Sequence, residues 1–188
     1  MNLKSIFNDA RLVRVANSAR KSRFALTVCI LASALPLCAA RVLYLSGTLD
    51  GFEESPARTW TLYHEGNGSG GFELNAGTAQ GGLNNAWLTS ITGWSSVGRS
   101  VFLAAHPLGC VGRIDIRPFG SVKLNFEIID PPTWTYVALK TVTLSGSAYQ
   151  TVSVGPFVPA GSVFVRVSLL GNGGFSAVRV DNLSVICG

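Results

Sequence analysis

The sequence predicts an all-β domain, an antiparallel sandwich or barrel, that follows an N-terminal secretion signal. After Arg41, apolar and polar residues alternate with the two-residue period of a strand through most of the chain. Clusters of glycine, proline, serine and asparagine separate the alternating stretches and are typical of turns. No stretch after Arg41 sustains the apolar period of a helix. About ten short strands joined by such turns indicate an antiparallel fold around one core.

The size and charge of the chain narrow the possible functions. Its 188 residues, 47% of them hydrophobic, are enough for one domain with a substantial core. The net charge of +5 arises within residues 1–40, which hold six basic residues and one acidic residue. The remaining nine basic and nine acidic residues cancel. The predicted domain therefore has no excess of positive charge that would attract nucleic acid.

Residues 1–40 have the pattern of a secretory signal peptide. A long basic segment precedes the apolar stretch 24–37, FALTVCILASALPL, and small residues follow it. Cys38 and Ala40 fit the two small positions of a cleavage site. Cleavage after Ala40 would release residues 41–188 as a secreted domain, extracellular or periplasmic, with no attachment to the membrane.

Cleavage of this leader has two alternatives. The apolar run that ends at Ala40 spans 17 residues, which is the short limit for a membrane helix. A membrane anchor that is not cleaved is therefore the main alternative. A lipoprotein is disfavoured because Leu37 precedes Cys38 at a position where lipidation signals usually have a small residue.

The four cysteines divide into two pairs at this cleavage site. Cys29 and Cys38 would leave with the leader, whereas Cys110 and Cys187 would stay in the exported domain. An even number of cysteines in an oxidising compartment favours a disulfide between them. Because the loop that it closes is long, the chain-entropy model gives such a disulfide roughly 4 kcal/mol at most. Two buried free thiols are the alternative.

Individual stretches indicate which residues the predicted sandwich would bury. The stretch 122–128, VKLNFEI, would bury its apolar face and expose Lys123, Asn125 and Glu127 on the other. The Gly-rich segment 65–82 is expected to be an irregular loop with one short strand near its residues 72–74. Further expected strands are RIDIRP (113–118), TYVALKTVTLS (135–145), YQTVSV (149–154), FVRVSLL (164–170) and SAVRVDNLSVIC (176–187).

Four segments, taken in order along the chain, resemble a known fold group. They are DGFEES (50–55), GTAQGGLNNAWL (77–88), TLSGSAYQTVSVGPFVPAGSVFVRVSLLG (143–171) and VRVDNLSV (178–185). Together they resemble the jelly-roll carbohydrate-binding modules and the wider galactose-binding-like β-sandwich group, over most of residues 49–187. The resemblance implies that the sandwich is a jelly roll and that it binds a glycan or polysaccharide without catalysing a reaction.

The resemblance also implies a structural calcium ion. In these modules the opening glutamate and the first aspartate of the closing motif commonly share calcium, and here these residues are Glu53 and Asp181. Carbonyl groups of the turn 77–82 would complete the hard oxygen ligands that calcium prefers. The second aspartate of the family motif is Asn182 here, which removes one charge. The alternative is a metal-free corner in which Glu53 accepts hydrogen bonds from backbone amides.

Aromatic residues are the candidates for contact with sugar, because sugars present apolar C–H faces to aromatic rings. Trp134 and Tyr136 follow the DPP sequence, and on a strand their i, i+2 spacing would point both rings the same way. Trp87 is the third candidate. The alternative is that the first two rings cover the core. By resemblance to the family, core positions are expected for Trp60, Trp94 and Tyr149.

The sequence does not predict an enzyme. GNGSGGF (66–72) is similar to a serine-protease motif, but His64 lies only five residues before Ser69, which does not fit the order of such a site. A pair of carboxylates for glycoside hydrolysis, for example Glu127 with Asp115 on one face, is marked by no motif. A structural or adhesive cell-surface domain that binds protein partners is the main alternative function, and a small glycan hydrolase is the less favoured one.

Overall fold

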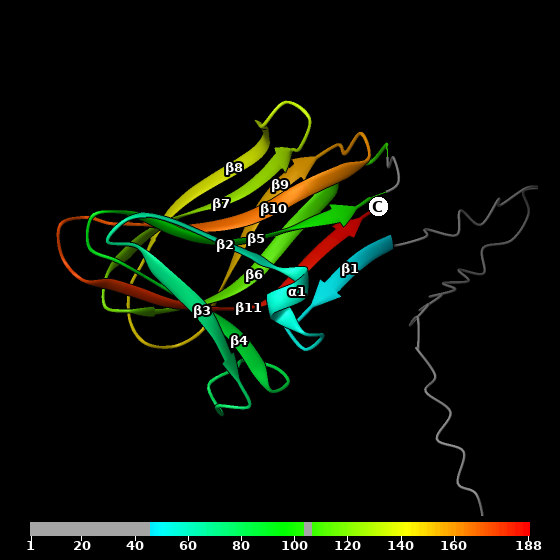
Figure 1. The fold of residues 1–188 in the computed structure, drawn as a ribbon. Helices are drawn as coiled ribbons and strands as arrows, with labels where there is room; N and C mark the ends of the chain where they lie inside the picture. The colour runs from blue at the N-terminus through cyan, green and yellow to red at the C-terminus, as the bar shows by residue number, and fades with distance from the viewer. Residues whose placement is uncertain (1–45, 104–106) are drawn as a thin grey trace, which may run out of the picture. The chain divides into compact units, whose positions relative to one another are not determined.

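The computed structural model describes residues 46–103 and 107–188, and the predicted signal peptide lies outside these residues. This part of the chain forms eleven strands and one short helix, α1 (Pro56–Thr59), and the strands make two sheets (Figure 1). The prediction of an all-β antiparallel sandwich is confirmed. No helix within the two described ranges is long and apolar enough to span a membrane.

The first sheet has six strands in the order β3-β4-β11-β6-β9, and β1 also pairs with β11. Its strands are β1 (Ser46–Asp50), β3 (Ser69–Leu74), β4 (Asn84–Ser90), β6 (Cys110–Phe119), β9 (Gln150–Phe157) and β11 (Ser176–Cys187). Strand β4 pairs with the first half of β11, whereas β1 pairs with the second half. The first and last strands of the domain therefore lie side by side (Figure 1).

The second sheet has five strands in the order β2-β5-β10-β7-β8. Its strands are β2 (Thr61–Gly66), β5 (Gly93–Phe102), β7 (Val122–Asp130), β8 (Thr135–Leu144) and β10 (Ser162–Leu170). The central strand, β10, pairs with β5 on one side and with β7 on the other. This sheet carries the candidate site on its outer face.

The hydrophobic core lies between the two sheets, and it follows from the alternation in the sequence. On β7, Leu124 and Phe126 are fully buried in the core, whereas Lys123 is exposed on the outer face. Each such buried side chain contributes about 1.5–3 kcal/mol relative to its exposure in water. Near the start of the domain the Phe52 ring stacks on the Trp60 ring, with centroids 4.3 Å apart. Trp60 thus occupies the core position that the family resemblance implies.

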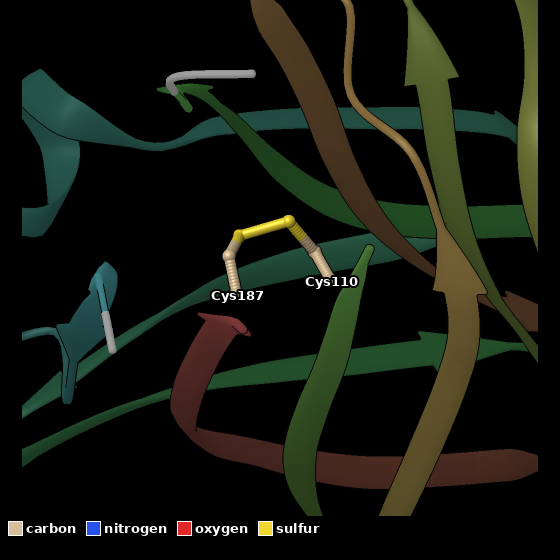
Figure 2. The surroundings of a disulfide bond; sticks show 2 residues. All are labelled: Cys110 and Cys187. Atoms are coloured by element: carbon tan, nitrogen blue, oxygen red, sulfur yellow. A yellow bond between two sulfur atoms is a disulfide. The ribbon is translucent and has the colours of Figure 1, made fainter. Parts of the chain in front are cut away.

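The predicted disulfide joins Cys110 at the start of β6 to Cys187 at the end of β11 (Figure 2). The two cysteines are register partners on adjacent strands, and both are buried. The bond links positions 77 residues apart in the sequence. It therefore fixes the last strand of the domain to the middle of the chain.

The local structure of two segments depends on a few of their residues. Residues 51–55 are not extended, because the side chain of Asp50 accepts the Phe52 N–H at 2.8 Å and turns the chain out of β1. Phe52 has a φ of 62° as a result. In the segment expected to be mostly loop, β3 is a full strand whose glycines give room for its neighbour. A Cβ atom on Gly71 would lie 2.8 Å from Nε1 of Trp87.

Candidate functional site

The outer face of the five-stranded sheet has a depression that four of its strands line. Its volume is about 170 Å³. We call it the groove, and it is lined by Trp94 of β5, Asn125 and Glu127 of β7, Tyr136 of β8, and Arg166, Ser168 and Leu170 of β10. Successive side chains of a strand point to opposite faces of the sheet, and each of these side chains points outward. They therefore lie together on one face.

The register of the strands sets which groove residues are neighbours. Arg166 of β10 lies directly opposite Glu127 of β7, and Ser168 lies opposite Asn125. On the other side of β10, Arg166 lies opposite Gly98 of β5. The polar residues therefore form two adjacent rows that cross the middle of the sheet.

Glu127 is the most buried ionisable residue of the groove, with 2% of its surface exposed. Its carboxylate forms an ion pair with the guanidinium of Arg166, through Nε. Oγ of Ser168 donates to it at 3.3 Å, and Nδ2 of Asn125 makes a longer contact of 3.4 Å. Asn125 is held in turn by Thr141 of β8, whose hydroxyl donates at 2.8 Å. These partners offset the large cost of burying a charged carboxylate.

Trp94 lies in the groove and not in the core, where the family resemblance had placed it. Its neighbours along β5 alternate so that Ser95 and Val97 face inward and Trp94 faces outward. The indole Nε1 donates to Glu65 of β2 at 2.7 Å, and the guanidinium of Arg166 lies 5.9 Å from the ring centroid. Trp94 is therefore fixed on both sides, by a carboxylate and by a cation.

A row of aromatic rings borders the groove on the same face. The Phe164 ring lies between Tyr63, at 6.2 Å, and Trp134, at 5.7 Å between centroids. Phe164 has this position because Gly98 lies beneath it. A Cβ atom at Gly98 would come within 2.7 Å of the Phe164 ring. The glycine therefore lets the aromatic row lie flat across β5 and β10.

Trp134 and Tyr136 are both on the surface, with 59% and 54% of their area exposed. The alternative that they cover the core is therefore excluded by the structure. The two residues differ in their local structure. Tyr136 is on β8, whereas Trp134 belongs to the turn before β8, where its N–H donates to the carbonyl of Asp130 at 2.8 Å. Tyr136 lines the groove and Trp134 borders it through Phe164.

Trp87, the third candidate from the sequence, lies on the other sheet. It belongs to β4 of the six-stranded sheet, where the flanking residues Ala86 and Leu88 face the core. Its half-buried ring therefore lies on the outer face of that sheet, against Gly71 of β3. The three predicted ligand-binding residues do not form a single site.

Solved structures of low sequence identity share this arrangement of sheets. A family 61 carbohydrate-binding module, TmCBM61 in complex with β-1,4-galactotriose, superposes with a TM-score of 0.56 at 14% identity, over 74% of this chain and 95% of that one. A family 11 module from Clostridium thermocellum, in complex with a β-1,3-1,4-mixed-linked tetrasaccharide, gives 0.51 at 13% identity, over 76% and 95%. A CBM4 module gives 0.51 at 14% identity, over 76% and 95%.

The chain has the jelly-roll fold of carbohydrate-binding modules. The resemblance that the sequence motifs indicate is thereby confirmed at the level of the fold. No protein-family model matches the sequence of this jelly-roll domain, and no curated protein matches it.

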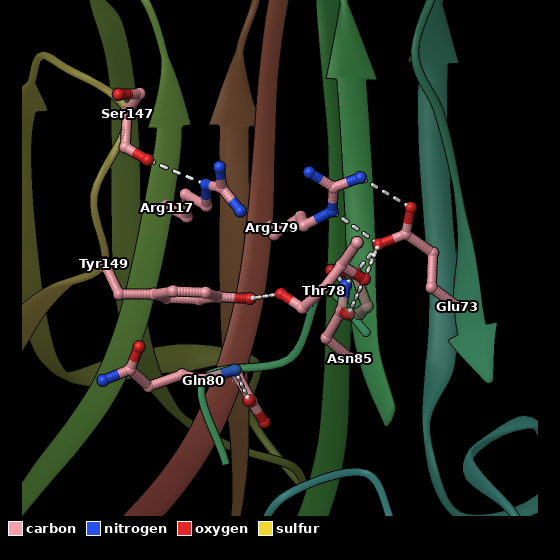
Figure 3. Close-up of polar contacts among 10 residues, drawn as sticks. Glu73, Thr78, Gln80, Asn85, Arg117, Ser147, Tyr149 and Arg179 are labelled. Atoms are coloured by element: carbon pink, nitrogen blue, oxygen red, sulfur yellow. Dashed lines mark hydrogen bonds and ion pairs between the residues drawn. The ribbon is translucent and has the colours of Figure 1, made fainter. Parts of the chain in front are cut away.

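The outer face of the six-stranded sheet carries a second polar cluster, which the sequence did not reveal (Figure 3). Arg179 of β11 donates to both carboxylate oxygens of Glu73 of β3, at 2.6 and 2.9 Å. Asn85 and Thr78 donate to the same carboxylate at 2.8 and 2.9 Å. The hydrogen bond from Arg179 is the main cause that lowers the pKa of Glu73 to about 2.

This second cluster attaches the Gly-rich turn before β4 to the strands of the six-stranded sheet. The hydroxyl of Tyr149 donates to the carbonyl of Thr78 at 2.9 Å (Figure 3). Burial of the phenol raises the pKa of Tyr149 to about 12, so it stays a donor at physiological pH. Because both carboxylate oxygens of Glu73 already have protein partners, the cluster has a structural role.

Glu53 and Asp181, the predicted calcium ligands, converge on this same turn. Oε1 of Glu53 accepts the N–H groups of Leu83 and Asn84 at 2.9 and 3.0 Å. The fully buried Asp181 accepts three backbone N–H groups, from Gln80, Gly81 and Asn182, at 2.7, 3.0 and 2.7 Å. Burial raises the pKa of Asp181. These contacts are those of the metal-free alternative.

The donor set of this corner is nevertheless compatible with calcium. Two carboxylates lie at one turn, and a carboxylate oxygen that accepts an N–H has a second lone pair. Oε2 of Glu53 has no hydrogen-bond partner among the described residues. Among residues 46–103 and 107–188, however, no three His, Cys, Asp or Glu side chains gather as metal ligands would. Backbone or amide oxygens would have to supply the remaining ligands, and calcium binding stays a prediction.

The pair of carboxylates considered for hydrolysis does not exist. Asp115 belongs to β6 of the six-stranded sheet, whereas Glu127 belongs to β7 of the five-stranded sheet. Both residues point outward from their sheets, because their strand neighbours Ile114 and Phe126 fill the core between. The two carboxylates therefore face away from each other on opposite sides of the jelly-roll domain.

Proposed function

We propose that this jelly-roll domain binds a glycan in the groove of its five-stranded sheet. The observation that carries the proposal is the combination of aromatic rings with fixed polar groups on one open face. Tyr136 and Trp134 offer exposed rings to the apolar C–H faces of a sugar. Beside them, Arg166 and Glu127 are held in place by their ion pair and can hydrogen-bond to hydroxyl groups.

We further propose that the groove binds without catalysis. Glycoside hydrolysis needs one carboxyl group that can give up a proton and a second that can act as base or nucleophile. The carboxylates of Glu127 and Glu65 lie on this face, and each has a fixed partner: Glu127 is paired with Arg166, and Glu65 accepts the indole N–H of Trp94. Both groups are committed to holding other groove residues in position.

The export of the domain is part of the same proposal. The buried disulfide between Cys110 and Cys187 is typical of proteins that fold in an oxidising compartment. Together with the signal-peptide pattern of residues 1–40, it supports a secreted or periplasmic domain. A structural calcium ion at Glu53 and Asp181 would, in this proposal, stabilise the turn next to β4 and take no part in the groove.

A binding screen of the purified protein tests the proposed function. Soluble polysaccharides such as β-1,4-galactan and mixed-linked β-glucan are tested by affinity gel electrophoresis, and insoluble ones by pull-down. Retardation by at least one neutral polysaccharide is expected, and substitution of Tyr136 by alanine should weaken it. A folded protein that binds no polysaccharide in the screen would contradict the proposal and favour the alternative of a structural domain that binds protein partners.

A further inference from the structure

We infer that Glu127 sets the charge selectivity of the groove, so that it accepts neutral sugars and rejects acidic ones. The inference rests on the proposed function, because it concerns which glycan the same groove takes. It starts from one contact: the guanidinium of Arg166 is the cation that lines the groove, and the carboxylate of Glu127 neutralises it.

An arginine without this partner would favour acidic ligands. A guanidinium binds a carboxylate or sulfate strongly, through two parallel hydrogen bonds. Here Nε of Arg166 already donates to Glu127, and the ring of Trp94 lies against the guanidinium. The terminal nitrogens of Arg166 make no hydrogen bond to the residues that the structure describes, so they remain available as donors. They belong, however, to an ion pair whose total charge is zero.

Glu127 also presents an acceptor to the groove. Its Oε2 receives both Arg166 and Ser168, whereas Oε1 has only the long contact from Asn125 at 3.4 Å. The groove therefore offers a donor and an acceptor beside each other. Two neighbouring hydroxyl groups of a sugar match this pair, because each hydroxyl can donate and accept.

An acidic sugar would meet the wrong charge at this point. A carboxylate close enough to reach Arg166 would lie beside the buried carboxylate of Glu127, and like charges placed together across an interface weaken binding. Lys123 lies on the same outer face of β7 but does not line the groove, and no second groove-lining cation offsets this repulsion within the described part of the chain. Stability alone does not explain the ion pair between Glu127 and Arg166, since buried ion pairs are often no more stable than apolar residues of the same volume.

The direct test compares matched neutral and acidic polymers. β-1,4-Galactan and mixed-linked β-glucan are each used in native form and after oxidation of their primary alcohols to carboxylates. For whichever polymer the wild-type protein binds, oxidation should weaken binding about tenfold or more. This comparison needs no variant and is unaffected by any folding defect. Equal or tighter binding of the oxidised polymer would overturn the inference.

The variant Glu127→Gln keeps the shape of the side chain and removes its charge. We expect it to lose about tenfold in affinity for the native polymer and to gain about tenfold for the oxidised one, because Arg166 is then unneutralised. In the double variant Glu127→Gln, Arg166→Gln the gain for the oxidised polymer should disappear. Glu73→Gln is the matched control, since Glu73 forms the same kind of pair with Arg179 on the opposite sheet.

The outcomes separate the inference from the proposed function. If the wild-type protein binds none of the polymers, the proposed function fails. If it binds them and folded Glu127→Gln keeps the wild-type preference, the inference about Glu127 fails and the proposed function stands. If Glu73→Gln changed the preference between native and oxidised polymer as much as Glu127→Gln does, the effect would not be local to the groove. That result would also contradict the inference.

Discussion

Arg166 and Glu127 are cross-strand partners, opposite each other in the register of β10 and β7, and their ion pair lies in the groove of the five-stranded sheet. The contact continues to both sides. Trp94 of β5 packs on the guanidinium and is hydrogen-bonded to Glu65 of β2. Four strands thus contribute one residue each to a chain of contacts across the sheet, which holds the groove side chains in position.

Substitution of Trp134 or Tyr136 by alanine should weaken glycan binding with little effect on folding. Both rings are more than half exposed, so their loss removes a contact surface for sugar and leaves the core intact. We expect about a tenfold loss of affinity for each, measured by isothermal titration. The melting temperature should change by no more than about 2 °C.

Trp87→Ala provides the matched control for these variants. Trp87 has the same chemistry as Trp134 but lies on the outer face of the six-stranded sheet. Its removal should leave affinity for the glycan unchanged. If Trp87→Ala abolished binding and Trp134→Ala did not, the ligand would belong to the other sheet.

The ion pair between Glu73 and Arg179 should make stability depend on pH in acid. In the folded protein the pKa of Glu73 is lowered to about 2 from an ordinary value of 4.5, chiefly by Arg179. A lowered folded-state pKa stabilises the protein above the unfolded-state pKa, and this stabilisation is lost as the pH falls toward the folded-state value. At neutral pH we expect Glu73→Gln to be about 1–3 kcal/mol less stable than wild type.

Thermal melts of both proteins from about pH 7 to about pH 2 measure this effect. The difference between wild type and Glu73→Gln should be constant near neutrality and shrink below about pH 4.5. Because the comparison is made against wild type, the opposite contribution of Asp181, whose pKa is raised, cancels. A difference that did not change with pH would show that the charge of Glu73 adds nothing to stability.

Removal of the disulfide should destabilise the domain. The double variant Cys110→Ala, Cys187→Ala opens a link between positions 77 residues apart, and we expect a loss of about 2–4 kcal/mol in the free energy of unfolding. Both cysteines are buried, so reductant should act on the native wild-type protein only as it unfolds. Equal denaturant midpoints for variant and wild type would mean that the bond does not stabilise the fold.

Much of this fold followed from the sequence because its signals are local. The alternation in 122–128 identified the inward and outward faces of β7, and with them the outward position of Glu127. The disulfide followed from the count of cysteines in the part of the chain that the sequence predicts to be exported. These features depend on the strand period and on the number of cysteines, both of which can be read directly from the sequence.

The groove could not be predicted in the same way, because it depends on which strands are neighbours. Arg166 and Glu127 are 39 positions apart, and only the register of β10 against β7 brings them together. Trp94 follows a turn, so the alternation around it did not fix its direction. The sequence nevertheless contains a signal for these two groove residues. RVSL (166–169) and NFE (125–127) each place a charged residue among apolar neighbours on a strand.

Calcium should stabilise the domain if Glu53 and Asp181 bind it. We expect a higher melting temperature in excess calcium than in EDTA, by an amount that corresponds to about 2.7 kcal/mol when the free ion is a hundred times its dissociation constant. Asp181→Asn should remove this difference. Identical melts of the wild-type protein in calcium and in EDTA would instead assign the stability of the corner to the N–H groups that already bind the two carboxylates.

The proposed glycan site lies on the outer face of the five-stranded sheet. Its most direct test is a titration of the ¹⁵N-labelled protein with a polysaccharide fragment that the screen identifies, observed through the indole N–H signals of the tryptophans. We predict that the signals of Trp94 and Trp134 shift, whereas those of Trp60, in the core, and Trp87, on the opposite sheet, do not. Shifts confined to Trp87, with Trp94 and Trp134 unchanged, would show that the glycan binds on the six-stranded sheet instead.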